Sequence, residues 1–509
     1  MGSIEDVPDQ AFKATPKNDQ FWKSIQDHKA RDRILDEAVK HVESHKLKAQ
    51  AMQNGSAFDR NLEEVLDQRR SSQNLATLHR WDHAVDFSSN DFLSLASNGI
   101  LREEFLKEIA RYPDFRLGST GSRLLDGNNP YCEALEEEIA TFHGAETAIL
   151  VSSGYDANCA IFCGIPRPGD VIVYDELIHA SVQDGMKHSL TETSIPFRHN
   201  DPNSFRDVLD DIEETYPLVR KGQRCVLIAV ESVYSMDGDV CPLKSLVEIA
   251  GEVFPKKNVA FAVDEAHSTG LMGIQGRGLV SDLGLEKEIA IRLHTFGKGM
   301  STTGAAILSN GTVKNMLLNF ARPLIYTTAP SFPMLAAIKA GYNLLKTDQL
   351  TPLKENMQNL VTHFHNKILE DPEWKAITKA GTCSIPLFDN WEKRDYITQF
   401  VPVWTREKYN YFLSIHLLND NFSAIPINPP VVPRGTGRVR LIIHAGNTIE
   451  QVEELAASIL TWAKEMHAIE TGKTKERLPA VAKKLQLLMA ASGHDMSDIP
   501  ATAGNPFLE

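Results

Sequence analysis

Five polar side chains that can take part in catalysis stand just past apolar, strand-like runs of the sequence: His179, Ser235, Asp264, His267 and Lys298. The Lys298 amine lies between two glycines and can form an imine with a carbonyl compound. Burial and nearby cations lower a lysine pKa and so release the neutral amine that attacks. Asp264 ends a nearly uncharged run, where a carboxylate is costly to bury without a positive partner such as a protonated heterocyclic nitrogen. Taken one at a time, these residues also suit ordinary loops and turns.

A candidate phosphate site lies at Ser152-Ser153-Gly154-Tyr155, between the apolar run 148–151 and a stretch that can begin a helix at 157–161. Backbone N–H groups at the beginning of a helix attract anions, and a glycine lets the anion approach the main chain. Many strand-to-helix turns contain Ser-Gly, so this motif alone is weak evidence for phosphate binding.

The elements that would position these side chains alternate between strands and helices. β-rich runs are predicted at 148–151, 171–174, 225–230, 259–263 and 291–296. A helix is predicted to begin after Asn129, which can cap it, with Pro130 in its first position and Gly144 as its stop. This alternation predicts an α/β fold with a mostly parallel sheet covered by helices on both faces. In such sheets ligands bind in the loops beyond the carboxyl ends of the strands.

We expect the 509 residues to divide into five segments. These are a helical N-terminal arm at 1–85, a large domain at 86–330, connecting helices at 331–370, a small C-terminal α+β domain at 371–466 and an extension at 467–509. The arm carries one apolar stripe, typical of a helix that packs on the main body or on a partner subunit, at Ile34, Leu35, Ala38, Val39 and Val42. Within the small domain, 381–396 looks like an irregular insertion. One amphipathic helix and a flexible tail are expected after Leu478.

Composition excludes several classes of protein. Apolar residues make up 42% and charged residues 24%, which is typical of a globular chain rather than a disordered or collagen-like one. The net charge of −14 argues against a protein built mainly to bind nucleic acid. Six cysteines without C-x-x-C spacing are expected to be buried thiols rather than a disulfide framework or a metal site. We see no secretory signal, membrane span or peroxisomal address, and therefore expect a soluble cytoplasmic protein.

Taken together, the candidate residues occur in the order and spacing of one family. Eight runs carry the pattern: FSSNDFLSLA (87–96), GSTGSRLLDGN (118–128), SSGYDAN (152–158), DELIHAS (175–181), SVYSMDGD (232–239), VDEAHSTG (263–270), HTFGKG (294–299) and PPVVPRGTGRVRL (429–441). From about Asp86 to Leu460, the chain resembles the α-oxoamine synthases, which are pyridoxal-phosphate enzymes of fold type I. The resemblance implies pyridoxal 5'-phosphate as the cofactor and an acyltransferase activity on a fold of the aminotransferase class I/II type.

The resemblance implies roles for the five polar residues named first. Lys298 resembles the lysine that holds the cofactor and later moves the substrate α-proton. Asp264 resembles the carboxylate paired with the ring nitrogen, which keeps the ring an electron sink. His179 resembles the imidazole stacked on the ring, while His267 and Ser235 resemble contacts to its phenolic oxygen.

The resemblance also implies a shared phosphate site. Gly154 and Tyr155 match the phosphate-side loop, and Thr295 matches a further phosphate contact. In the family, hydroxyls from the neighbouring subunit complete this site. Thr327 and Thr328 occupy the corresponding segment, so a homodimer is implied.

Asn90 and Arg440 resemble the residues that hold the carboxylate of the amino acid, a task that suits the planar fork of arginine. The implied reaction removes the α-proton of an amino acid and adds the carbanion to an acyl thioester. Carbon dioxide and a thiol leave, and an α-amino ketone remains. The runs at 87–96 and 235–239 most resemble 8-amino-7-oxononanoate synthase, which condenses alanine with pimeloyl-CoA in biotin synthesis.

Three departures from the family pattern concern the substrate. Leu75 is followed by Ala76, where bacterial members often have an arginine that helps bind the acyl group. Ile442 and Ile443 follow the carboxylate arginine where a hydroxyl is common, and Met300–Thr303 replaces a more glycine-rich stretch. A related synthase with another acyl chain or amino acid, serine palmitoyltransferase-like or in secondary metabolism, therefore stays open. So do another pyridoxal-phosphate reaction, such as transamination, and a non-catalytic partner subunit, although the intact lysine, aspartate and histidine argue against the latter.

Overall fold

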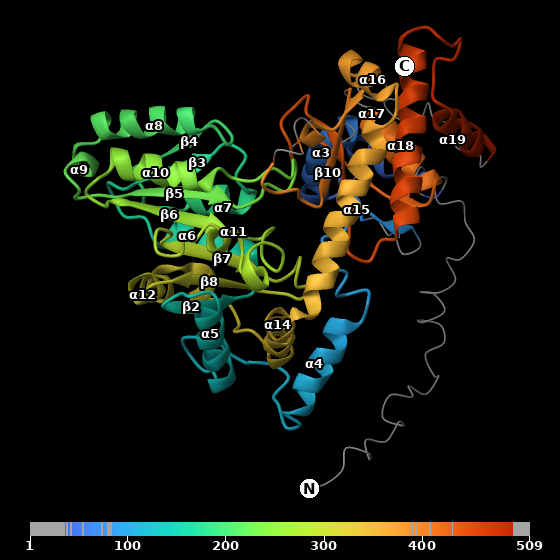
Figure 1. Ribbon diagram of the computed structural model, residues 1–509. Coiled ribbons are helices and arrows are strands. Elements are labelled where there is room, and N and C mark those ends of the chain that lie inside the picture. The colour runs from blue at the N-terminus through green and yellow to red at the C-terminus, as the bar shows by residue number, and fades with distance from the viewer. Residues whose placement is uncertain are drawn as a thin grey trace. The chain divides into compact units, whose positions relative to one another are not determined.

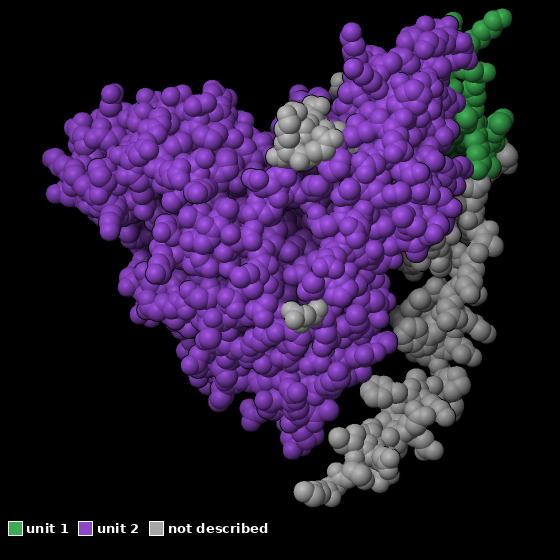
Figure 2. Space-filling view, viewed as in Figure 1, with its two compact units in different colours: residues 1–80, 475–509 green, residues 81–474 purple. Residues whose placement is uncertain are grey.

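The computed structural model describes residues 36–491, apart from short gaps at 37–38, 41–42, 53–54, 73–74, 79–83, 389–390, 392–393, 407–408 and 430. The chain forms two compact units, one of residues 1–80 together with 475–509 and the other of residues 81–474 (Figure 2). All twelve candidate site residues belong to the second unit. The predicted division of that unit into a large and a small domain stays a prediction.

A seven-stranded sheet forms the centre of the second unit (Figure 1). Its order is β2-β8-β7-β6-β5-β3-β4, and only β8 runs antiparallel to its neighbours. The strands are β2 (Thr147–Val151), β3 (Val171–Asp175), β4 (Thr193–Phe197), β5 (Val226–Glu231), β6 (Val259–Asp264), β7 (Ile291–Thr295) and β8 (Ala305–Ser309). The predicted runs are therefore strands, and the predicted α/β fold with a mostly parallel sheet is confirmed.

Both faces of this sheet are buried because side chains alternate along each strand. On β5, Val226 and Ile228 belong to the core under α8 and α10, whereas Leu227 and Ala229 belong to the core under α6 and α7. The helices between the strands are α6 (Gly154–Gly164), α7 (Ala180–Lys187), α8 (Pro202–Thr215), α9 (Pro217–Arg220), α10 (Leu243–Val253), η2 (Ile274–Gly276), α11 (Leu279–Asp282), α12 (Gly311–Phe320) and α13 (Arg322–Ile325).

Two helices begin where local sequence chemistry favours it. α5 (Pro130–Phe142) is capped by Asn129, whose side-chain oxygen accepts the Cys132 N–H at 3.0 Å. α6 is capped by Ser153, whose hydroxyl accepts the Asp156 N–H at 3.1 Å. Because of this cap, α6 begins at Gly154, three residues before the predicted position. Its amino end therefore follows β2 directly.

A smaller antiparallel sheet lies in the C-terminal part of the second unit, in the order β12-β13-β10-β9. Its strands are β9 (Cys383–Ser384), β10 (Phe400–Thr405), β12 (Ile425–Ile427) and β13 (Arg438–Ile442), while β1 (Val85–Asp86) pairs with β11 (Phe422–Ser423). The expected small α+β arrangement is confirmed. The expected irregular insertion at 381–396 is wrong at its beginning, because β9 pairs with β10 and the turn η4 (Pro386–Phe388) follows.

The remaining helices of this unit are α4 (Ile100–Ala110), α14 (Phe332–Leu345), η3 (Asp348–Leu350), α15 (Thr351–Leu369), α16 (Trp374–Ala380), α17 (Tyr409–Asn419) and α18 (Ile449–Glu470). α14 packs against α4, and α15 packs against α18, which also contacts α17. The helical stretch predicted at 331–370 is thus confirmed.

The first unit contains η1 (Ala49–Met52), α3 (Ala57–Ser71) and α19 (Ala480–Ala491). The amphipathic helix expected after Leu478 is therefore confirmed as α19, and the tail after it lies outside the described residues. Buried Arg70 holds α3 together through ion pairs of 2.5 Å to Glu63 and Asp67. Of the predicted apolar stripe, Val39 is described, whereas Ile34, Leu35, Ala38 and Val42 lie outside the described residues.

The six cysteines are free thiols, but the prediction that all are buried is wrong. Cys225, which precedes β5 at the amino-terminal edge of the sheet, is exposed, and two cysteines on the outer side of α6 are only partly buried. In the part of the chain that the structure describes, no helix combines the length and apolar character needed to cross a membrane. The same residues contain no cluster of histidine, cysteine and acidic side chains that could hold a metal ion.

The close approach of α6 to β7 gives a first test. A Cβ at Gly154 would lie 2.3 Å from Cγ2 of Thr295, nearer than two carbon atoms can approach. We expect Gly154→Ala to lower the free energy of unfolding by about 1–3 kcal/mol through overpacking. Adding Thr295→Ser, which removes Cγ2, should restore most of that loss in urea unfolding.

Gly251→Ala is the matched control, because this glycine lies within α10 and a Cβ added there would meet no atom within 4 Å. We expect it to leave the stability unchanged or slightly raised. Equal losses in Gly154→Ala and in the double variant would contradict the packing argument.

Candidate functional site

The candidate catalytic residues converge at the carboxyl ends of the central strands. Glu231, Asp264 and Leu293 lie side by side, in register, on β5, β6 and β7. His179 follows β3 and caps α7, and Lys298 follows β7. Because the carboxyl ends of neighbouring parallel strands meet at one edge of a sheet, residues far apart in the sequence share one site.

The Lys298 amine lies 2.9 Å from Nε2 of His267. Burial lowers the pKa of Lys298, and Arg440 acts in the same direction, while Asp264 and Glu231 oppose the shift. Burial also lowers the pKa of His267 well below its usual value, so the ring is neutral and can accept a hydrogen bond from the amine. The surroundings therefore favour the uncharged, nucleophilic amine that imine formation needs.

Asp264 is joined to His179 by a chain of hydrogen bonds. One oxygen of Asp264 accepts the Ala266 N–H at 2.9 Å, and the other accepts the side-chain amide of Asn158 at 2.8 Å. The same amide donates to the Ser181 hydroxyl at 3.0 Å, which in turn lies 2.7 Å from Nδ1 of His179. Burial lowers the pKa of His179, although Asp264 opposes this. The imidazole therefore has a fixed orientation and favours its neutral form.

A second buried carboxylate, Glu231, lies beside Asp264 on the neighbouring strand. Its Oε1 accepts the backbone N–H of His179 at 2.8 Å. Burial raises the pKa of Glu231 well above its usual value, and the charge of Asp264 adds to the shift. Glu231 therefore favours its protonated form, in which it places no second negative charge beside Asp264.

The candidate phosphate residues lie at the amino end of α6. Gly154 begins the helix and lies so close to Thr295 that a Cβ there would collide with its Cγ2. The Thr295 hydroxyl is buried and has no hydrogen-bond partner among the described residues, and the exposed Tyr155 donates its hydroxyl proton to Asp184. An anion such as phosphate suits helix N–H groups together with an unsatisfied hydroxyl.

Arg440 faces the loop that carries Ser235. Its Nη1 donates to the backbone oxygen of Ser235 at 3.4 Å, and its guanidinium lies 5.8 Å from the centre of the Phe400 ring. Burial lowers the pKa of Arg440 to about 10, so the group remains a cation at neutral pH. Since this charge also shifts the pKa of Lys298 and of His267, the arginine belongs to the same site.

Asn90 lies in the loop after β1, and its side-chain oxygen is buried without a partner. The next residue, Asp91, accepts a hydrogen bond from the hydroxyl of Ser301, three residues after Lys298. The two loops are thereby fixed to each other, which places an unsatisfied amide group close to the lysine segment.

Thr327 and Thr328 are the candidates that the structure leaves apart from the others. Their side chains are exposed in the turn after α13, and they share no described hydrogen bond with the Lys298 cluster. The following residue, Ala329, donates its N–H to the Gly121 oxygen at 2.8 Å and accepts from the Ser119 hydroxyl at 2.6 Å. This turn therefore packs on the 118–128 segment with both threonines outward.

Sequence reasoning missed three residues that hold the site together, namely Asn158, Ser181 and Glu231. Asn158 could have been found, because it lies four residues after Gly154 and therefore on the same face of α6. Ser181 could have been inferred from its place two residues after His179, where it meets the imidazole. Glu231 carried no such signal, because only the pairing of β5 with β6 places it beside Asp264.

Comparisons with known proteins agree with this geometry. The family model for aminotransferase class I and II matches residues 82–459. The aminoacyl transferase sphA of Aspergillus fumigatus is 49% identical over 466 residues, which are 91% of this chain and 99% of that protein. The 8-amino-7-oxononanoate synthase of Emericella nidulans is 43% identical over 397 residues, which are 78% of this chain and 92% of that protein.

Solved structures share the fold. A serine palmitoyltransferase from S. paucimobilis, which holds a pyridoxal-phosphate adduct of myriocin, matches 76% of this chain and 89% of its own, with a TM-score of 0.64 and 24% identity. The 8-amino-7-oxononanoate synthase of Francisella tularensis matches 77% of this chain and all of its own, with a TM-score of 0.56 and 24% identity.

The unsatisfied Thr295 hydroxyl, the amino end of α6 at Gly154 and the anchored Asp264 carboxylate fit the phosphate and the ring nitrogen of pyridoxal phosphate. The chain belongs to the aminotransferase class I and II family, and within it to the pyridoxal-phosphate-dependent acyltransferases known as α-oxoamine synthases.

Proposed function

We propose that this enzyme condenses an amino acid with an acyl-CoA whose chain is not pimeloyl, releasing carbon dioxide and free CoA and leaving an α-amino ketone. The observation that carries the reaction class is the convergence of Lys298, His267, Asp264 and His179 at one strand edge. The bound pyridoxal phosphate supplies an electron sink for the carbanion, and the residues below supply binding, orientation and proton transfer.

Each residue of the cluster would take its own part with the cofactor bound. Lys298 would hold the cofactor through its neutral amine and move the substrate α-proton. Asp264 would pair with the ring nitrogen, and the Asn158 amide holds that carboxylate in position. His179 would pack on the ring, and His267 and Ser235 would contact its phenolic oxygen.

The phosphate is held by the N–H groups of Gly154 and Tyr155 and by the Thr295 hydroxyl. We infer that Thr327 and Thr328 reach the phosphate of a second copy of the chain, so that a homodimer shares its two sites. The outward orientation of both threonines supports this arrangement, because neither is satisfied within its own subunit's cluster.

Arg440 and Asn90 hold the amino acid carboxylate. Arg440 offers a cation with a planar donor fork, and Asn90, on the opposite loop, offers the N–H donors of its side-chain amide. Fixing the carboxylate from both sides selects which bond to the α-carbon breaks.

The relatives support an acyl chain other than pimeloyl. The match to the aminoacyl transferase spans 91% of this chain, whereas the match to the fungal 8-amino-7-oxononanoate synthase spans 78%. Ala76 stands where an arginine would help bind an acyl substrate, so a distal carboxylate lacks that partner. Ile442 and Ile443 are fully buried apolar residues, so this stretch lacks the hydroxyl that is common there. Condensation of alanine with pimeloyl-CoA remains the second candidate because of the 43% identity.

Loss of the lysine tests the cofactor assignment. We expect the purified protein with added pyridoxal phosphate to show a visible absorbance band that Lys298→Ala abolishes, because the covalent attachment is gone. Lys287→Ala, which removes an exposed lysine, should keep the band. If the parent protein shows no band at saturating cofactor, the enzyme assignment fails.

Arg440→Ala tests the carboxylate site. We expect the KM for the amino acid to rise about 10- to 100-fold, the effect of losing a charged hydrogen bond, with cofactor affinity largely retained. Steady-state kinetics and cofactor titration measure the two effects separately. Arg434→Ala, in an exposed turn of the same segment, should change neither. An equal loss of cofactor affinity in Arg440→Ala would contradict the role.

A substrate panel tests the acyl chain. Pimeloyl-CoA and saturated acyl-CoAs of increasing length are each paired with alanine and with serine, and carbon dioxide release and product mass are recorded. We expect at least one unsubstituted acyl-CoA to exceed pimeloyl-CoA by about tenfold or more in kcat/KM, because burying an unpaired carboxylate is costly. A clear preference for pimeloyl-CoA would sink this proposal and support the biotin-type candidate.

A further inference from the structure

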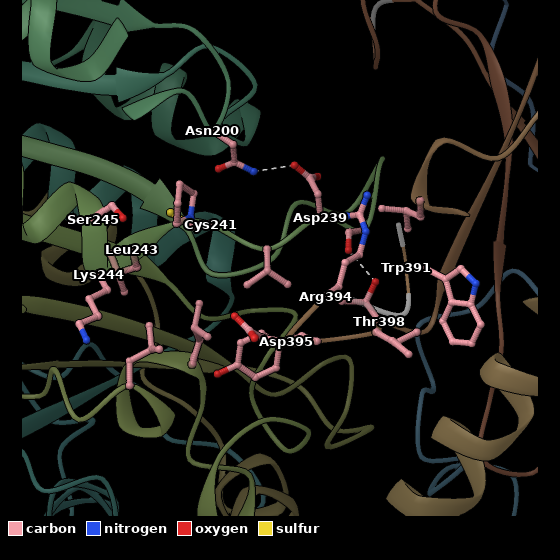
Figure 3. Close-up of a pocket in the computed structure, with 18 of the residues that line it drawn as sticks. Asn200, Asp239, Cys241, Leu243, Lys244, Ser245, Trp391, Arg394, Asp395 and Thr398 are labelled. Atoms are coloured by element: carbon pink, nitrogen blue, oxygen red, sulfur yellow. Dashed lines mark hydrogen bonds between the residues drawn. The ribbon is translucent and has the colours of Figure 1, made fainter. Parts of the chain in front are cut away.

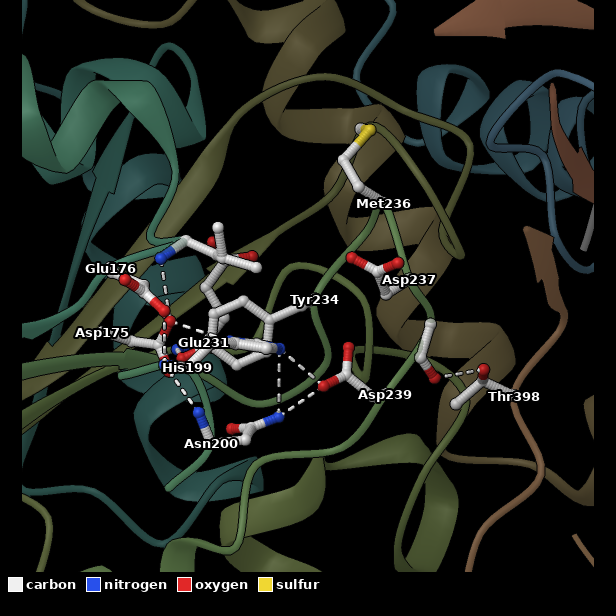
Figure 4. Close-up of polar contacts among 12 residues, drawn as sticks. Asp175, Glu176, His199, Asn200, Glu231, Tyr234, Met236, Asp237, Asp239 and Thr398 are labelled. Atoms are coloured by element: carbon white, nitrogen blue, oxygen red, sulfur yellow. Dashed lines mark hydrogen bonds and ion pairs between the residues drawn. The ribbon is translucent and has the colours of Figure 1, made fainter. Parts of the chain in front are cut away.

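A second group of charged side chains, one buried and two partly buried, lies beside the loop that carries Ser235 (Figure 4). His199 lies between two carboxylates, with Nδ1 2.8 Å from Asp175 and Nε2 2.7 Å from Asp239. The neighbouring Asn200 follows the same pattern, since its backbone N–H donates to Asp175 at 2.9 Å and its side-chain amide donates to Asp239 at 2.5 Å.

These contacts keep His199 charged. Burial lowers the pKa of His199, but the hydrogen bonds to Asp175 and Asp239 outweigh it and raise the pKa to about 10. The imidazolium therefore donates from both nitrogens at neutral pH. The ring also packs edge-on against Tyr234, with the ring centres 4.5 Å apart.

The two carboxylates belong to two walls of the cofactor site. Asp175 ends β3, and its side chain accepts the Leu177 N–H in the short loop that leads to His179. Asp239 ends the turn that carries Ser235. His199 is thus bonded to both loops at once and contacts neither the ring-stacking histidine nor the serine directly.

A cavity of about 610 Å³ borders the Ser235 loop at Gly238 and Asp239 (Figure 3). Its lining includes Asn200, Gly238, Asp239 and Thr398 but none of the twelve candidate site residues. Packing on that side is therefore open, and the loop depends on individual polar bonds to stay in place.

Several polar bonds hold the loop. Arg438 pairs with Asp237, and the Thr398 hydroxyl donates to the Gly238 oxygen at 2.6 Å, so these two anchors come from β13 and from the segment just before β10. His199 and its neighbour Asn200 both bind Asp239 and both bind Asp175, and they therefore tie the Ser235 loop to the loop of His179. His199 is the charged member of this pair.

We propose that His199 is a positioning residue, which sets the spacing between the His179 wall and the Ser235 wall of the cofactor site by bridging Asp175 and Asp239. This inference rests on the proposed function of that site. The side chain acts through the two loops and touches neither the substrate nor the reacting atoms.

His199→Gln tests the proposal, because a neutral amide can satisfy one of the two carboxylates but cannot charge-pair both. We expect a folded protein whose cofactor binds about 10-fold or more weakly, whose visible circular dichroism band is reduced, and whose kcat falls about 10- to 100-fold, in the range typical of outer-shell partners. Arg198→Gln is the matched control, since it removes the adjacent cation, which forms only an exposed ion pair with Asp201.

A purely structural role gives a different pattern. If His199 stabilised only the fold, His199→Gln would lower the unfolding midpoint. The visible circular dichroism band, the cofactor affinity and the kcat of the folded fraction would stay unchanged, and that result would overturn the proposal. Failure of the proposed function is distinguishable, because the parent protein itself would then lack the cofactor band.

Asp239→Asn serves if His199→Gln does not fold, since it weakens the same bridge at its more exposed end. It should reduce the visible band and kcat in the same direction. Where both single variants fold, the losses in the double variant should not add, because both changes break one interaction. Additive losses, or an unaffected band in Asp239→Asn, would contradict the bridge.

Discussion

The buried charge balance at the carboxyl edge of β5, β6 and β7 is the constraint on which the site depends. Asp264 and Glu231 lie in register on neighbouring strands, with Lys298 and Arg440 facing them. In a low-dielectric interior, burial disfavours the charged forms of Glu231 and Lys298. It raises the pKa of Glu231 and lowers the pKa of Lys298. They leave one carboxylate available for a cationic ring nitrogen and one amine available for attack.

Buried polar groups without hydrogen-bond partners indicate where a ligand would bind. The Thr295 hydroxyl, the Asn90 oxygen and Nδ1 of His267 are buried and lack partners within the described chain. Buried polar groups are usually paired, so such groups at one strand edge indicate a molecule that completes them. Gly154 packs directly against Thr295, since any side chain there would collide with Cγ2. The packing of α6 on β7 therefore depends on the same two residues that we propose for phosphate binding.

Most candidate site residues lie in loops or at strand ends, so hydrogen bonds from other side chains must hold them in position. Asn158 fixes Asp264 and, through Ser181, orients His179. His199 extends this support outward, because its two carboxylate partners belong to the loops of His179 and Ser235. The residues proposed for catalysis lie at the strand ends. We propose that their spacing depends on the neighbouring side chains of Asn158, Ser181 and His199, which hold them in place.

Local sequence is enough to predict most of the strands and several helices of this chain. Asn129 and Ser153 cap their helices because caps act within three residues, and the strands follow from runs of apolar side chains. The resemblance of the motifs around Asp264 and Lys298 also indicates the family and its cofactor. The position of Glu231 beside Asp264, the bridge that His199 forms between two loops and the exposure of Cys225 follow from the folded chain alone. These facts depend on the order and register of strands distant in the chain, which local sequence preferences do not encode.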